Sequence, residues 1–207
     1  NDGVNDSVDK VIGDQSSINT TSLNLTVFLG DSSNLSRIIN ESAKIRIMDG
    51  DFAIVEFVLD FSLYRLNLTN AAIDKQQANA TGSLIAKGLR MPAGITKTLY
   101  MDKIDATLNG ISIKDEELNS ISEISGSCSS ANEFNVGCDG TLQSSYACDY
   151  NSTSKKYRIS GLKHSGIVQM QYSKPASHSG SSASSPSGSG GGGGGVICIS
   201  DWQCGKW

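Results

Sequence analysis

The sequence predicts an all-β protein: an immunoglobulin-like β-sandwich, then a smaller disulfide-stapled β domain and an extended C-terminal tail. Three observations support this fold class. Apolar and polar residues alternate in many short runs, as they do in half-buried strands. Turn signals such as Asp49-Gly50 separate these runs. Near the C-terminus the composition changes to serine and glycine, which cannot form a core.

The first 105 residues predict an arm followed by a sandwich. Residues 1–17 are polar and predict an irregular N-terminal arm, whereas residues 18–105 predict the β-sandwich domain. The strongest run is 51–61, a predicted central strand with five alternate apolar residues on one face: Ala53, Val55, Phe57, Leu59 and Phe61. Including it, about seven strands are expected, as in an immunoglobulin-like sandwich: 22–29, 44–48, 51–61, 63–68, 71–77, 82–89 and 96–105.

Residues 106–173 predict the second, smaller β domain. Its expected strands are 133–138, 142–148, 156–160 and 167–172, and Asp115–Leu118 reads as one helical turn with acids at its N-terminus. About 65 residues make a thin core, so a disulfide is expected here. A bond between Cys138 and Cys148 would close a ten-residue loop, which contributes on the order of 2–3 kcal/mol.

The remaining residues predict a linker and a tail. Residues 174–195 form a Gly/Ser-rich linker, with 16 Ser or Gly among positions 177–195. Residues 196–207 are apolar and strand-like but have no partner strand nearby, and an isolated strand is not stable in water. This tail either docks on a partner or belongs to a longer module. The start at Asn1, without Met or a signal sequence, predicts a mature or trimmed product.

The number of N-x-S/T sequons is the sharpest compositional signal. Random placement of 14 Asn and 43 Ser plus Thr predicts about three, whereas eight occur. Covalent N-glycans on an extracellular protein are therefore expected, although Asn/Ser-rich loops would also produce sequons. The sequon asparagines are Asn5, Asn19, Asn24, Asn34, Asn40, Asn67, Asn79 and Asn151.

Five cysteines without C-x-x-C spacing also fit an oxidising compartment better than a zinc site. Their number is odd, so at least one lacks a partner within the chain. For Cys128 we consider two alternatives. It is a buried free thiol, or it forms an interchain disulfide with Cys198 or Cys204 of a neighbouring copy.

Composition argues against several function classes. A net charge of −4 and a pI near 5.1 do not fit a nucleic-acid binder, and no apolar run is long enough to span a membrane. Of the two histidines, His164 reads as a turn residue and His178 as solvated. Asp49 and Asp51 read as turn residues rather than a calcium or glycosidase pair. We therefore expect no enzyme activity, catalytic residue, metal site or cofactor.

Several short motifs of the chain carry a family resemblance. They are Leu23-Asn24-Leu25-Thr26 through Gly30, Asn34-Leu35-Ser36, Ile54-Val55-Glu56-Phe57 with Asp60-Phe61, Leu66-Asn67-Leu68-Thr69, Lys97-Thr98-Leu99-Tyr100-Met101-Asp102, Ile113-Lys114-Asp115-Glu116, Ser120-Ile121-Ser122-Glu123-Ile124-Ser125 and Gly161-Leu162-Lys163-His164-Ser165-Gly166. With these motifs the chain resembles secreted surface proteins of uncultivated archaea. Those proteins look like β-domains followed by a Gly-rich linker and Cys/Trp modules similar to thrombospondin type 1 repeats. Cys198, Trp202, Cys204 and Trp207 match the opening strand of such a module. In proteins of this kind the position of Ser112 is often Cys, which implies that Cys128 lacks its usual partner.

Two functions follow as expectations. The first is a structural subunit that assembles with other copies of itself, head to tail, into a surface filament. Its assembly tail would fill a sheet edge of the next copy with Val196, Ile197, Cys198, Ile199, Trp202 and Trp207. The alternative is a cell-surface adhesin or glycan-binding module, with a groove rimmed by tyrosines: Tyr64, Tyr100, Tyr150, Tyr157 and Tyr172.

Overall fold

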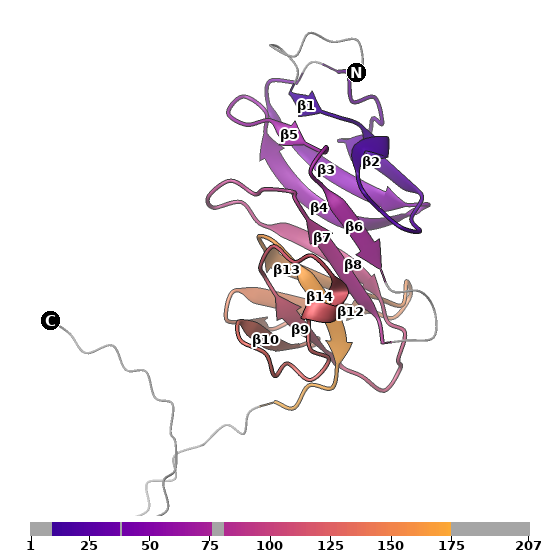
Figure 1. Ribbon diagram of the computed structural model, residues 1–207, viewed down its shortest axis with the longest axis vertical. Coiled ribbons are helices and arrows are strands. Elements are labelled where there is room, and N and C mark those ends of the chain that lie inside the picture. Colours follow the sequence, from indigo (N-terminus) through magenta and orange to yellow (C-terminus); the bar gives the residue numbers. More distant parts are fainter. Residues whose placement is uncertain (1–9, 38, 76–80, 175–207) are drawn as a thin grey trace, which may run out of the picture. The chain divides into compact units, whose positions relative to one another are not determined.

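The computed structural model describes residues 10–37, 39–75 and 81–174 (Figure 1). The chain divides after Lys174, and residues 1–174 form one compact unit. The predicted tail 196–207, and the predicted linker apart from Lys174, lie outside the described residues. In the expected irregular arm, the described part contains a short strand, β1 (Val11–Ile12), and a 3-10 helix, η1 (Gln15–Ser17). Val11 is buried, which explains why this part of the arm is ordered against the body.

One layer of the body is an antiparallel sheet of seven strands in the order β11-β12-β13-β8-β4-β3-β2. The predicted central strand 51–61 corresponds to β4, which lies inside this sheet and buries its apolar face. A two-residue turn at Gly50-Asp51 joins β3 to β4, as the Asp-Gly signal predicted. The strands are β2 (Leu25–Leu29), β3 (Ser42–Asp49), β4 (Phe52–Asp60), β8 (Lys97–Asp102), β11 (Leu142–Gln143), β12 (Tyr146–Asn151) and β13 (Lys156–Leu162).

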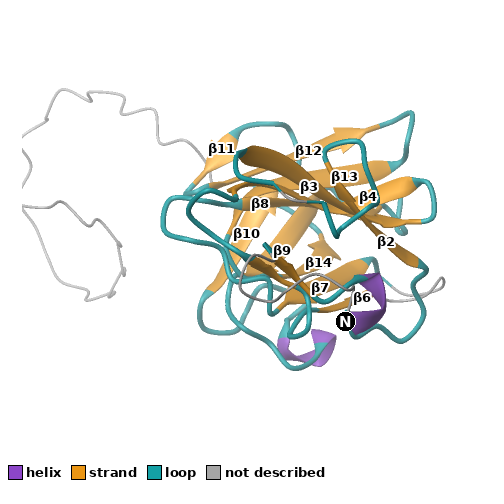
Figure 2. Cartoon of the chain, turned by 90° about the horizontal axis from the view of Figure 1, so that it is seen from above, coloured by secondary structure: helices purple, strands orange, loops and turns teal. Residues whose placement is uncertain are grey.

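The second layer is a five-stranded antiparallel sheet in the order β10-β9-β14-β7-β6, which faces the first (Figure 2). A short parallel pair joins β1 to β5 (Leu66–Asn67). The only other described helix is η2 (Ile121–Glu123), and no described helix is long and apolar enough to cross a membrane. The second sheet consists of β6 (Ala72–Lys75), β7 (Ser83–Lys87), β9 (Gly110–Lys114), β10 (Glu133–Gly137) and β14 (Gly166–Met170).

The core lies between the two sheets. Val27, Val55 and Leu99 of the larger sheet and Ile73 and Ile113 of the smaller one belong to the same buried cluster. Burying an aliphatic side chain contributes roughly 1.5–3 kcal/mol, so this contact is the main source of stability. A small second cluster covers the outer face of the five-stranded sheet, with Ile85, Leu118, Ile124 and Val168 as its members. The prediction of an all-β sandwich is therefore confirmed.

The expected division into domains 18–105 and 106–173 differs from the structure. Strand β8 pairs with β13, and β7 pairs with β14, so strands of both intervals share both sheets. The buried cluster likewise contains residues of both intervals. Residue 105 is therefore not a boundary between structural units, and twelve strands form a single sandwich larger than an immunoglobulin domain.

Three local predictions in the second interval also need correction. Strand β9 was not expected, although Ile111 and Ile113 are fully buried in the core. The single strand expected at 142–148 is two strands, because the chain turns at Ser144, where φ is +58°. The helical turn at 115–118 is absent. Its first residue, Asp115, instead accepts hydrogen bonds from the main-chain N–H groups of Lys163 and His164.

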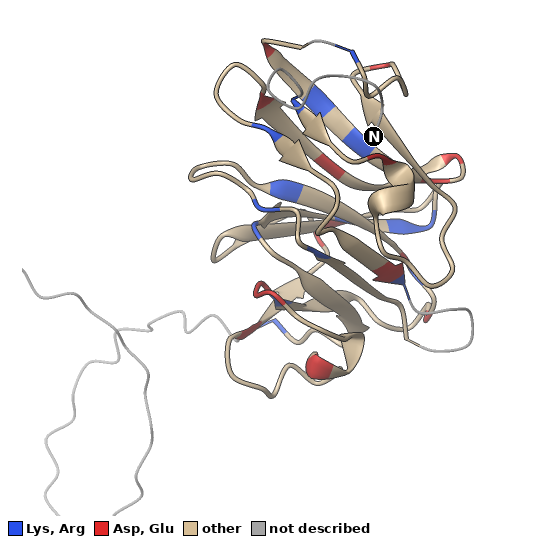
Figure 3. Cartoon of the chain, turned by 45° about the horizontal axis from the view of Figure 1, so that its top comes forward, with Lys and Arg blue, Asp and Glu red and all other residues tan. Residues whose placement is uncertain are grey.

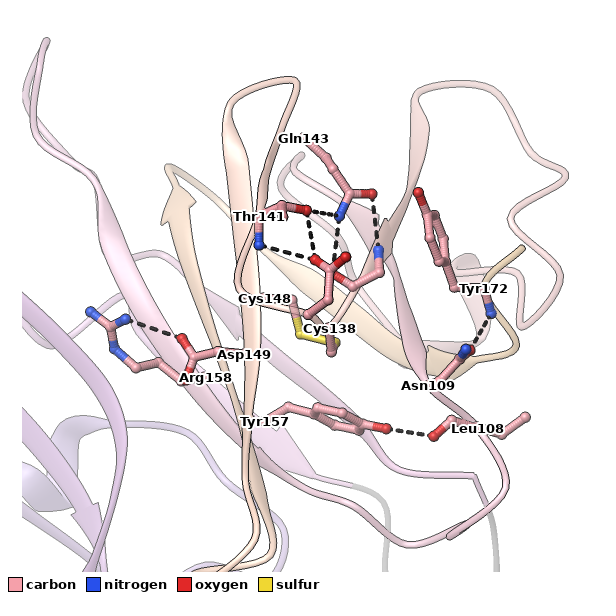
Figure 4. Close-up of a disulfide and its surroundings, with 12 residues drawn as sticks. Leu108, Asn109, Cys138, Thr141, Gln143, Cys148, Asp149, Tyr157, Arg158 and Tyr172 are labelled. Carbon is pink, nitrogen blue, oxygen red and sulfur yellow. Dashed lines mark hydrogen bonds and ion pairs between the residues drawn. A yellow bond between two sulfur atoms is a disulfide. The ribbon is translucent and has the colours of Figure 1, made fainter. Parts of the chain in front are cut away.

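A disulfide joins the two sheets at one side of the sandwich (Figure 4). Cys138 directly follows β10 and Cys148 lies in β12, so the predicted Cys138–Cys148 bond is confirmed, with 4.4 Å between the Cα atoms. Beside it, the Gln143 side chain accepts a hydrogen bond from Gly137 N and donates one to Gly137 O, both at 3.1 Å. These bonds satisfy main-chain groups of the edge strand β10 that no neighbouring strand reaches.

Candidate functional site

The sequon asparagines lie mainly on the surface. Asn5 and Asn79 are outside the described residues. Asn67 is half-buried in β5. The other five are exposed: Asn19, Asn24, Asn34, Asn40 and Asn151. Attachment of a glycan requires an accessible amide nitrogen, and these positions meet that requirement at five of the six described sites.

Three sequons also build turns. The side-chain oxygens of Asn34, Asn67 and Asn151 accept hydrogen bonds from the main-chain N–H two residues later, at 3.1, 3.0 and 2.9 Å. Four aspartates, which cannot carry an N-glycan, make the same bond to a serine or threonine: Asp14, Asp60, Asp105 and Asp139. Asn and Asp side chains therefore stabilise turns whether or not they carry a glycan. The turn uses the amide oxygen and a glycan uses the nitrogen, so the two roles are compatible.

We expect Asn67→Asp to preserve stability and Asn67→Ala to reduce it. The Asn67 oxygen accepts bonds from Thr69 N and from Thr69 Oγ1 at 2.7 Å, and a carboxylate at position 60 serves Ser62 in the same way. Loss of this acceptor should lower the free energy of unfolding by about 1 kcal/mol. Both variants lack the sequon, so any glycan effect is common to them. Equal urea midpoints for the two variants would contradict a role in the turn.

Cys128 is a half-buried thiol without a disulfide among the described residues. Burial raises its pKa; the hydroxyl of Ser112 acts in the opposite direction, and the nearby Glu133 carboxylate raises the pKa further. The Ser112 hydroxyl is fully buried and has no partner of good hydrogen-bond geometry, so its contact with the thiol is weak. A protonated thiol of this kind is a poor nucleophile at neutral pH. Cys198 and Cys204, the expected interchain partners, lie outside the described residues, as do all six residues of the assembly tail.

Of the three residues that the sequence assigned to turns, His164 and Asp51 lie in turns, whereas Asp49 is the last residue of a strand. His164 lies in the turn between β13 and β14, where its Nδ1 is 3.1 Å from Glu117 Oε1. Asp49 ends β3 and pairs with Lys75 of the other sheet, while Asp51 is in the hairpin turn. Within the described residues, no group of three or more His, Cys, Asp or Glu side chains is arranged to hold a metal ion.

The tyrosines do not gather around one groove. Tyr157 is fully buried and donates a hydrogen bond to Leu108 O at 2.7 Å (Figure 4). Tyr100 is half-buried and donates to Glu56 Oε2 at 2.6 Å. Tyr64 and Tyr150 are 38% and 39% exposed, and Tyr172 is half-buried against Gly110 and Gly137. Packing within the sandwich therefore describes Tyr100, Tyr157 and Tyr172 better than a shared binding rim.

A buried lysine is the most unusual charged group of the body. Lys97 begins β8 on the inward face, is 1% exposed, and donates a hydrogen bond from Nζ to Ala86 O at 2.9 Å. Burial lowers the pKa of Lys97 to about 8, although the carboxylates of Asp115 and Glu117 partly oppose the shift. The alternation of Lys97 with Leu99 and Met101 is the sequence signal that this side chain points inward.

A row of polar side chains crosses the outer face of the seven-stranded sheet. Lys44 of β3 pairs with Glu56 of β4 at 2.9 Å, and Tyr100 of β8 donates to the same carboxylate. Further along, Arg158 of β13 pairs with Asp149 of β12 at 3.2 Å. Charges of both signs alternate across the strands rather than forming a patch of one sign (Figure 3).

Burial opposes the ionisation of Glu56, but hydrogen bonds from Tyr100 and Lys44 outweigh it, so the pKa of this carboxyl is lowered. Glu56 is therefore an anion at neutral pH, with each oxygen engaged by a different partner. The row is thus a network of ion pairs and hydrogen bonds that links neighbouring strands on this face of the sheet.

Comparisons of the chain with protein-family models, with curated proteins and with solved structures gave no match. The protein is an all-β sandwich whose two sheets are joined by a disulfide.

Proposed function

We propose that the chain is a structural subunit of an extracellular, N-glycosylated surface filament, joined head to tail by its C-terminal segment. The observation that carries this proposal is that residues 10–174 supply a continuous two-sheet core by themselves. The apolar residues at 196–207 are therefore not needed to complete their own body, and apolar side chains gain stability only where a surface buries them.

Two further features support an extracellular site. The body contains a disulfide between its sheets, and disulfides persist mainly in oxidising compartments. Exposed sequon asparagines stand near sheet edges, with Asn24 directly before the edge strand β2 and Asn19 bridged to the edge strand β6. Glycans there would shield main-chain groups against edge-to-edge aggregation and leave assembly to a dedicated segment.

We expect deletion of residues 196–207 to abolish filament formation while the body stays folded. The measurement is electron microscopy and sedimentation of the full chain and the deletion variant, both secreted from a glycosylating host, with thermal unfolding as a check of the fold. A double change of Ile197 and Ile199 to Ser should act like the deletion, and Ser184→Ala, in the linker, should change nothing. Filaments of normal length from the deletion variant would refute the proposal, and so would a wild-type chain that stays monomeric.

A further inference from the structure

The outer face of the seven-stranded sheet carries an open hollow of about 540 Å³. Its floor is formed by outward-facing residues of four neighbouring strands, β3, β4, β8 and β13, and its wall by the loop at Gly94–Thr96. This volume lies within the range of ligand sites, roughly 300–1,000 Å³. The principal side chains of the hollow are Lys44, Glu56, Val58, Ile95, Thr98 and Arg158.

The polar side chains of the hollow are held in place before any ligand arrives. Glu56 is fixed through one oxygen by Lys44 and through the other by Tyr100, and Asp149 holds Arg158. An ammonium has three N–H donors and a guanidinium five, so donors remain for a ligand after these contacts. The Lys44 and Arg158 side chains are 53% and 50% exposed, which leaves them within reach of solvent and of a bound molecule.

The charges of the hollow balance. Lys44 and Arg158 are cationic, and Glu56 and Asp60 are anionic. Asp60 accepts hydrogen bonds from Ser62 N at 2.9 Å and Ser62 Oγ at 2.6 Å, and these bonds lower the pKa of its carboxyl. A hollow with both signs and no net charge gives no long-range attraction to an anion or a cation. It instead offers paired donors and acceptors, which hydroxyl groups can use because each both donates and accepts.

Two apolar side chains complete the hollow. Val58 of β4 is 53% exposed and lies opposite Lys44 of β3, and Ile95, which belongs to the wall, is half-buried. From this combination we propose that the hollow is a binding site for an uncharged oligosaccharide. The sugar hydroxyls would bond to Lys44, Glu56 and Arg158, and a C–H face of one ring would cover Val58.

Such a glycan has two sources with the same chemistry. Ser42 lines the hollow and is the third residue of the sequon Asn40-Glu41-Ser42, whose asparagine is exposed. A glycan on Asn40 would therefore start close to the hollow of its own chain. The other source is a glycan on another molecule. Neither source depends on assembly through the tail, but the first rests on the N-glycosylation that is part of the proposed function.

The test uses the full glycosylated chain and tetrasaccharides of different charge. Mannotetraose and cellotetraose are the neutral probes, tetragalacturonate is the anionic probe, and a chitosan tetramer is the cationic probe. Binding is measured by calorimetric titration and by amide chemical shifts. We expect a neutral probe to bind best and to shift residues of β3, β4, β8 and β13. The Asn40→Gln variant, titrated in parallel, distinguishes the two sources.

Val58→Arg, which fills the floor, should raise the Kd of the neutral probe about tenfold or more. The matched control is Leu142→Arg, because Leu142 is 73% exposed on the edge strand β11 of the same sheet and does not line the hollow. Tighter binding by Asn40→Gln than by wild type supports occupancy by the chain's own glycan, and equal binding supports a glycan from elsewhere. The inference is overturned if no neutral probe binds either chain, if a charged probe binds more tightly, or if Val58→Arg binds as well as Leu142→Arg.

Discussion

The free energy of unfolding is expected to rise by about 3 kcal/mol between pH 8 and pH 10.5 on account of Lys97. In the folded protein burial lowers the pKa of this ammonium to about 8, from an ordinary value of 10.5. Between these pH values the unfolded chain binds one proton more than the folded chain, so stability increases with pH. The penalty for burying the charge is fully present below pH 8 and disappears above pH 10.5.

Other groups titrate in the same region with the opposite sign. Burial, together with Asp115, raises the pKa of Tyr146 to about 12, and burial raises the pKa of Cys128. Each of these groups loses its proton more readily in the unfolded chain, so each lowers stability as pH rises through its unfolded value. Burial also raises the pKa of Tyr100 and Tyr157, so these groups together oppose the stabilisation from Lys97 at alkaline pH.

The variant Lys97→Met isolates the contribution of the lysine. At neutral pH this variant should have a higher free energy of unfolding than wild type, because it buries no charge. The difference should fall by about 3 kcal/mol from pH 7 to pH 10, and the contributions of the tyrosines and the thiol cancel in it. Urea unfolding across this pH range measures it. Leu99→Met is the matched control, since Leu99 is the next inward residue of β8 and carries no charge. Parallel pH curves for Lys97→Met and wild type would show that the lysine does not titrate as described.

Lys97 also illustrates what sequence alternation can and cannot reveal. The period of two correctly placed Val55, Phe57 and Leu59 on the buried face of β4, because side-chain direction in a strand depends only on the local backbone. The same rule places Lys97 inward. Charged residues are almost never fully buried without a partner. The charge of Lys97 therefore favours an exposed ammonium, whereas the alternation of the strand favours a buried one. Here Ala86 O provides the partner across the sandwich, and no local rule identifies it.

Strand partners were harder to predict than strands. The pairing of β8 with β13 joins residues separated by more than fifty positions, and nothing in either segment specifies the other. The split at residue 105 therefore seemed natural in the sequence although the fold crosses it. The disulfide was predictable, because Cys138 and Cys148 are close in sequence and the linkage closes a short loop. The hollow on the outer face was not, since it requires strands from separate parts of the chain, together with the loop before β8, to be neighbours.

Replacement of Gln169 by Met is expected to be the most destabilising change to a polar side chain, at about 4 kcal/mol. Gln169 lies in β14 and is 0% exposed. Its Oε1 accepts hydrogen bonds from the main-chain N–H groups of Gly82, Ile104 and Asp105 at 3.1–3.3 Å, and its Nε2 donates to Asp105 O at 2.5 Å. This one side chain therefore satisfies the main chain that leaves β8 and the main chain that enters β7.

Methionine has a similar length but cannot form these bonds, so several main-chain groups in the interior would lose their partner. Chemical denaturation measures the loss. Hydrogen exchange should in addition show faster exchange at Ile104 and Asp105, the residues that Gln169 holds.

Gln143→Met is the matched control for Gln169→Met. Gln143 also bonds to main-chain N–H and C=O groups, through its contacts with Gly137, but it is half-buried, so water can replace it. We expect this change to cost about 1 kcal/mol. Equal losses of stability in the two variants would contradict the importance of burial for Gln169. Apolar contacts of the segment between β8 and β9 would then have to hold that segment in place.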